Sequence, residues 1–236
     1  MYTQWPKQIW WPSDQPPTVI GWYSKKDNPM KQQETLNDAK DRVEASTSLR
    51  PTNEKLLKSF KMMKIPPHIK DLMRYMIISK IKCGAQWINI LGYSERAHCS
   101  FCKRVNNEET IKSKQHMWQD CKNNRQTQAW EMTRKIWQKC TLRPWPLLSI
   151  GLIRGSPALS YENDFNKDAE RLWTLISMTI WSIWKSRNKN TILNQVITSN
   201  KTRETLEELI QDLIRKSWNA THSMDEGRRK VHQCKI

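Results

Sequence analysis

The chain has 236 residues, enough for one good-sized domain or two small ones with a buried core. Lys and Arg number 40 against 23 Asp and Glu, a formal net charge of +17. This excess favours RNA or DNA as a partner and no membrane, although basic side chains can also serve solubility alone. Six Gly residues are too few for a fold with many tight strand turns, so the predicted fold class is mostly α.

The N-terminal residues and the lack of a long apolar stretch predict an intracellular protein of the nucleus or the cytoplasm. Met1–Trp5 lacks the basic stretch and apolar run of a signal peptide. The longest apolar stretch, around Leu172–Trp184, contains Thr and Ser and is too short to cross a bilayer. Disulfides are rare in reducing compartments, so the six Cys residues are predicted to be metal ligands or small hydrophobic side chains.

Three regions are predicted in chain order. Residues 1–50 are expected to form an irregular arm, because Pro occurs five times before position 30, with a short polar helix over Gln32–Ala45. Residues 51–190 are expected to form a small helical domain. Residues 191–236 are expected to form an amphipathic helix over Thr202–Trp218 and then a disordered basic tail.

Within the central region, hydrophobic spacing predicts three helices, which cover residues 66 to about 83–86, Arg125–Lys139 and Lys167–Asn190. A short apolar loop over Leu147–Pro157 is expected between the last two. The third helix is apolar almost all the way round, so it is predicted to lie at the centre of the core.

Four potential metal ligands fall within one short segment. Cys99 and Cys102 form a C-x-x-C pair, and His116 and Cys121 form an H-x-x-x-x-C pair. Together they make a Cys₃His set, which is typical of a structural Zn²⁺ site with no position open for water. A hydrolytic metal centre is therefore not expected.

Other interpretations of these residues exist. A C-x-x-C pair can be a redox dithiol, but no βαβ pattern flanks it here, and the four residues can also be unrelated in space. His98, next to Cys99, can either replace His116 or contact a ligand from outside. Cys83 and Cys140 are predicted to be core residues on helices, and Cys234 to be a free thiol in the tail.

The motifs around these ligands follow a recognisable order. C-x-x-C is followed by Glu109-Thr110, by H-x-x-x-x-C and by Trp130, and further on by Ile183-Trp184-Lys-Ser-Arg187-Asn188. This order resembles the reverse-transcriptase zinc-binding domain of non-LTR, LINE-like retrotransposons over about residues 51–190. The sequence departs from the family between Thr110 and His116, where five residues stand instead of the usual two.

In those elements the domain lies downstream of the polymerase and, in many fungal copies, downstream of an RNase H domain. Residues 1–50 are distantly similar to the last strand and helix of RNase H at Trp22, Glu34, Asp38 and Ala45. The His expected there falls near Lys26, and the carboxylates that hold two metal ions are missing. The arm is therefore at most a degenerate, non-functional remnant, and an unrelated linker is the alternative.

The resemblance implies a zinc-binding, nucleic-acid-binding fragment of a retrotransposon reverse transcriptase that is non-catalytic by itself. The basic residues near the ligands are predicted to contact phosphates: Lys103, Arg104, Lys112, Lys114, Lys122 and Arg125. Trp118 is expected either to stack on an unpaired base or to pack over the zinc site. The alternative function is a zinc-stabilised protein-interaction module that presents Trp-rich helices. No catalytic triad, Walker loop or dinucleotide-binding Gly pattern is present, so no enzyme is expected.

Overall fold

The computed structural model describes residues 29–62, 65–81, 83–122, 126–161, 166–193 and, apart from 202 and 209, 200–211. Most of the predicted arm and the whole predicted basic tail lie outside the described residues. Within them the chain is mostly helical, as predicted, and strand-type pairing is limited to an isolated bridge between His98 and Ile111.

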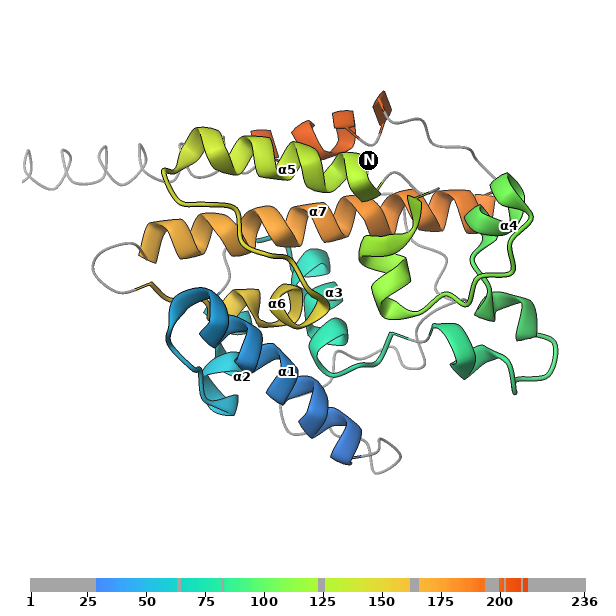
Figure 1. Cartoon of the computed structure of the whole chain (residues 1–236), viewed down its shortest axis with the longest axis horizontal. Coiled ribbons are helices and arrows are strands. Elements are labelled where there is room, and N and C mark those ends of the chain that lie inside the picture. Colours follow the sequence, from blue (N-terminus) through green and yellow to red (C-terminus); the bar gives the residue numbers. More distant parts are fainter. Residues whose placement is uncertain are drawn as a thin grey trace, which may run out of the picture.

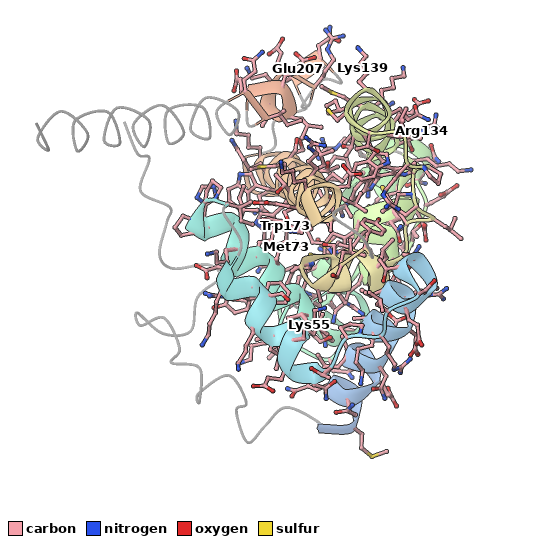
Figure 2. All side chains as sticks on the ribbon, turned by 90° about the vertical axis from the view of Figure 1, so that its left-hand side faces the viewer. Lys55, Met73, Arg134, Lys139, Trp173 and Glu207 are labelled. Atoms are coloured by element: carbon pink, nitrogen blue, oxygen red, sulfur yellow. The ribbon has the colours of Figure 1, made fainter. Side chains whose placement is uncertain are left out.

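The long helix α7 (Asn166–Leu193) occupies the centre of the molecule, as its all-round hydrophobicity predicts (Figure 1). Helix α5 (Gln126–Cys140) packs along one side of α7, while α3 (Pro67–Ile77) and α6 (Ile150–Gly155) pack along the other. Figure 2 shows Met73 and Trp173 inside this assembly, with Arg134 and Lys139 on the outer surface of α5. The core is therefore built in layers around α7.

Helix α1 (Pro29–Thr47) belongs to this core, whereas the sequence predicted only a short polar helix within an irregular arm. Leu36, Ala39 and Val43 recur at helical spacing and are buried, and α1 packs closely against α6. Only a narrow stripe of α1 is apolar, so the composition of the helix is polar overall. The residues of that stripe are nevertheless buried in the core.

Helix α2 (Asn53–Met62) follows α1 and was not predicted. It buries Leu56 and Phe60 in the same core, against the 3₁₀ turn that follows α6. Leu56 and Phe60 are four positions apart in the sequence, so both lie on one face of the helix.

Two predicted boundaries are wrong. Helix α3 ends at Ile77 instead of residues 83–86, because Ser79 adopts a left-handed conformation and the Lys80 N–H donates to the Tyr75 carbonyl. The predicted loop over Leu147–Pro157 contains α6 and a 3₁₀ turn (Ser156–Ala158), both buried. Ser149 caps α6 by accepting a hydrogen bond from the Leu152 N–H at 3.1 Å.

The predicted C-terminal helix is described only in part. Residues 200, 201, 203–208, 210 and 211 are helical, and Leu206 is fully buried in the core. Residues 212–218 of the prediction lie outside the described residues. No helix in the described part of the chain combines the length and the apolarity that crossing a membrane would need.

Candidate metal centre

The four predicted ligands lie on two short helical elements at one end of the molecule. Cys99 precedes helix α4 (Ser100–Asn106), and Cys102 lies in the first turn of α4 (Figure 1). His116 opens the single π-helical turn η4 (His116–Asp120), and Cys121 ends it. Each sequence motif therefore supplies its two ligands from the two ends of one turn.

The ligand atoms converge. The Sγ atoms of Cys99 and Cys121 are 3.6 Å apart, those of Cys102 and Cys121 are 3.8 Å apart, and Cys102 Sγ lies 3.5 Å from His116 Nε2. All four atoms lie within 4.8 Å of one another. A tetrahedral zinc ion places bound sulfurs about 3.8 Å apart and a sulfur and a nitrogen about 3.6 Å apart. The spacing therefore fits one bound metal ion.

The surroundings also suit a metal centre. Cys99 and Cys121 are fully buried, Cys102 is nearly so, and none of the three forms a disulfide. His98 does not join the cluster of potential ligands among the described residues. It occupies the bridge with Ile111 instead, so the alternative in which it replaces His116 is wrong.

Backbone hydrogen bonds hold the first pair of ligands in place. The Cys99 N–H donates to the Thr110 carbonyl at 2.8 Å, and the Lys112 N–H donates to the Ala97 carbonyl at 2.8 Å. Asn107 takes a left-handed conformation at the end of α4 and turns the chain back toward this bridge. The chain on either side of the C-x-x-C pair is thus clamped to the segment that leads to His116.

The five residues between Thr110 and His116 take part in this arrangement. Ile111 pairs with His98 in the bridge, and Ser113 begins the turn that carries His116. The Ser113 hydroxyl accepts a hydrogen bond from the His116 N–H at 2.9 Å, and its carbonyl accepts one from the Met117 N–H at 2.8 Å. This segment thus places His116 beside Cys102.

Helix α5 supports η4 through two side chains. Gln126 is fully buried, and its Nε2 donates to the carbonyls of His116 and Met117 at 3.1 and 2.7 Å. Trp130 donates from Nε1 to the Trp118 carbonyl at 2.8 Å. A buried carbonyl without a donor is costly, so these contacts fix the ligand-bearing turn on the core.

The surroundings of Cys99 favour its thiolate form. The hydrogen bond from Cys121 and the positive charge of Arg187 lower the pKa of the Cys99 thiol to about 3, against the opposing effect of burial. The thiolate is the form of cysteine that binds metals, so this environment prepares Cys99 as a ligand.

Neither of the other two cysteines in the described part of the chain belongs to the cluster. Cys83 is buried, as predicted, but in the turn after α3 rather than on a helix, and burial raises the pKa of its thiol. Cys140 ends α5 and is exposed, so the prediction that it is a core residue is wrong. Cys234 lies outside the described residues.

The residues predicted to contact nucleic acid fall into two groups. Lys103, Arg104 and Lys122 are exposed beside the ligands. Lys112 is half-buried, and burial lowers the pKa of its ammonium group. Lys114 is also half-buried and donates to the Ser79 carbonyl at 3.4 Å. Arg125 lies outside the described residues.

Trp118 does not have the exposure that stacking on a base would need. It is 1% exposed, and its ring packs on that of Trp184 with 5.8 Å between centroids. The stacking interpretation is therefore wrong, and the alternative of a packing residue beside the metal ligands fits. Trp118 lies within the single turn between His116 and Cys121, and its side chain faces the core.

Two features of this end of the molecule were missed in the sequence. Arg187 of α7 reaches Cys99, as described below. Tyr93 is 43% exposed, and the Arg96 guanidinium lies over its ring at 4.5 Å. The proximity of Tyr93 and Arg96 in the sequence could have indicated the second feature, whereas the contact to Arg187 spans 88 residues.

Comparisons with known proteins add no family assignment. No protein-family model matches the chain, and no curated protein or solved structure matches it. The geometry of the Cys₃His cluster and the chemistry of the surface around it are therefore the basis for a functional conclusion.

Proposed function

We propose that this chain is a zinc-stabilised nucleic-acid-binding domain, non-catalytic by itself and derived from a retrotransposon reverse transcriptase. The observation that carries the proposal is the convergence of three thiols and one imidazole at tetrahedral spacing. Soft thiolate ligands combined with imidazole are the donor set of structural zinc sites. All four positions of a tetrahedron are filled by protein, which suits a structural ion rather than one that activates water.

The zinc ion would supply stability that the ligand-bearing segment lacks. Besides short turns, that segment has only the seven-residue helix α4. Met117 and Trp118 of η4 join the main core, whereas Cys99, Phe101, Cys102 and Cys121 form a separate cluster. A cluster in which three of four members are ligands has little apolar area to bury, so metal binding provides much of its folding free energy.

The proposed partner follows from the charge next to the ligands and from the family resemblance. Lys103 and Arg104 lie on α4, and Lys122 follows Cys121, so one ion would fix all three exposed side chains relative to one another. The contact of Lys103 with Glu109 at 3.7 Å is on the surface and leaves the ammonium group accessible to a phosphate. Tyr93, not Trp118, has the exposed ring that a base could stack on.

The test is salt-dependent binding of the zinc-loaded chain to labelled single-stranded RNA and DNA, measured by fluorescence anisotropy. Replacing Lys103, Arg104 and Lys122 together by Ser is expected to weaken binding and to reduce the slope of log K against log salt by about 2. The matched control replaces Lys55, Lys58 and Lys61 by Ser on α2, at the opposite end of the molecule (Figure 1). It removes the same charge.

The control variant is expected to keep a steeper salt dependence and tighter binding than the first variant. Equal losses in both variants would contradict a binding surface beside the metal centre. Binding that does not respond to salt would contradict phosphate contacts altogether.

Exposed apolar side chains favour the alternative of a protein-interaction module. Leu91, Leu142 and Leu147 are each at least 90% exposed, and the last two flank a Pro-Trp-Pro turn. A chain that fails to bind either nucleic acid in the titration above would favour this second function. Replacement of Leu142 and Leu147 by Ser would then be expected to abolish the protein contact and leave the zinc content unchanged.

A further inference from the structure

The central helix α7 contacts the metal centre directly through a buried arginine. Arg187 Nη2 lies 3.8 Å from Cys99 Sγ. The guanidinium carbon is 5.2 Å from the centroid of the Phe101 ring, and the residue is only 5% exposed. An arginine near the end of α7 therefore faces a ligand 88 positions earlier in the sequence.

The surroundings of Arg187 leave its charge without a conventional partner. Its hydrogen-bond and ring contacts among the described residues are with the Cys99 sulfur and the Phe101 ring, and none is with a carboxylate. The positive charge of Lys112 lies close enough to interact unfavourably with it. Its Nη1 is buried without a hydrogen-bond partner in the same part of the chain. Burying a cation in this way is costly unless a negative charge lies close to it.

A loaded Cys₃His site provides that negative charge. Three thiolates and one neutral imidazole around a divalent zinc ion leave a net charge of minus one. The nearby guanidinium balances it in a low-dielectric setting where both charges would otherwise be unfavourable.

We propose that Arg187 is a positioning residue of the metal centre, which donates a hydrogen bond to the Cys99 thiolate and neutralises the net charge of the zinc-loaded site. This inference rests on the proposed zinc site. It adds that the affinity for the ion depends on a residue outside the ligand segment, and that α7 and the ligand segment are joined through the loaded site.

The geometry of α7 strengthens this link. Trp184 lies one turn before Arg187 on the same face of the helix and packs on Trp118, between the ligands of the second pair. One turn of α7 thus contacts both the C-x-x-C segment and η4. Loss of the ion is expected to loosen this turn as well as the ligand segment.

The experiment compares Arg187→Gln, Arg187→Lys and the wild type. Co²⁺ uptake is followed by its thiolate charge-transfer absorption, and Zn²⁺ affinity is measured by competition with a chromogenic chelator. Gln keeps polar hydrogen-bond donors but loses the charge, so Arg187→Gln is expected to bind zinc 10- to 100-fold more weakly. Arg187→Lys keeps the charge and is expected to stay closer to the wild-type affinity.

The matched control is Arg154→Gln. Arg154 is equally buried, at 8% exposed, but lies on α6 and pairs with Asp38 at 3.8 Å rather than with a ligand. This substitution is expected to lower stability and to leave the zinc affinity at the wild-type value. A purely structural role of Arg187 would give the same pattern for Arg187→Gln as for the control.

The outcomes separate the two proposals. A wild-type chain that takes up neither Co²⁺ nor Zn²⁺ would overturn the proposed zinc site itself. A wild type that binds zinc, together with an Arg187→Gln variant of unchanged affinity and spectrum, would overturn only the role of Arg187. If Arg187→Gln fails to fold, an Arg187→Lys variant as weak as a ligand substitution would contradict the charge argument.

Discussion

Single side chains outside the ligand set hold the metal centre in place. Gln126 is the clearest case, because one buried amide reaches two consecutive carbonyls of η4. The His116 carbonyl oxygen also accepts a hydrogen bond from the Cys121 N–H at 3.1 Å. Gln126 and the ligand Cys121 therefore both donate to the same backbone oxygen of the ligand His116. Such a network fixes a ligand geometry more firmly than the ligands alone.

Replacing Gln126 by Leu is expected to lower the free energy of unfolding by about 1–3 kcal/mol, because a buried carbonyl of η4 loses its donor. Zinc affinity is expected to fall as well. The control is Gln128→Leu on the exposed face of the same helix, expected to change stability by less than about 0.5 kcal/mol. Urea denaturation measures the free energy of unfolding of both variants. Equal midpoints for Gln126→Leu and the wild type would contradict the support role of Gln126.

At this scale the sequence predicted the ligands well and their surroundings poorly. The C-x-x-C and H-x-x-x-x-C pairs are local patterns, and short turns bring their ends together whatever the rest of the chain does. The burial of Trp118 and the contact of Arg187 depend on where α7 lies, which a local pattern does not contain.

Helix α6 is held against α1 by two glycines that permit a close approach. A Cβ added at Gly155 would lie 2.5 Å from Val43 Cγ2 and 2.7 Å from the Ala39 carbonyl oxygen. A Cβ at Gly151 would meet the side chains of Asp38 and Arg42 at 2.6 and 2.8 Å. The first obstacle includes backbone, whereas the second consists of part-exposed side chains that can move.

Gly155→Ala is therefore expected to destabilise the protein by about 1–3 kcal/mol through overpacking. Gly151→Ala is expected to cost less than about 1 kcal/mol, since Ala is the better helix former and offsets part of the clash. Thermal unfolding of the two variants tests the difference. A Gly155→Ala variant as stable as the wild type would contradict the close packing of α6 on α1.

The elements differ in how far the sequence predicts them. Helices α5 and α7 are long, and their apolar spacing, together with Pro144 and Pro146 after α5, indicates their limits to within about three residues. Helix α6 has six residues and is buried on every side, so it offers no polar face for a periodicity to appear. The end of α3 depends on the left-handed conformation of Ser79, a residue with no preference for it.

The whole molecule combines a large helical core with a small cluster around the ligands. The core joins residues from α1 to Leu206, while the second cluster contains only four residues, three of them ligands. Arg187 of α7 connects the two parts through Cys99 and Phe101, while Trp184 packs on Trp118 within the core. Metal removal is therefore expected to affect first the ligand segment and the end of α7, with the packing of α1 on α6 retained.

The most direct test of this account is the zinc-to-protein ratio of the purified chain after zinc loading and removal of free metal, measured by elemental mass spectrometry. The account predicts about one zinc ion per wild-type chain. It predicts a large loss of bound zinc in Cys102→Ser and no loss in Cys140→Ser, because Cys102 belongs to the cluster and Cys140 does not. A wild-type chain without zinc, or equal zinc in wild type and Cys102→Ser, would contradict the metal centre.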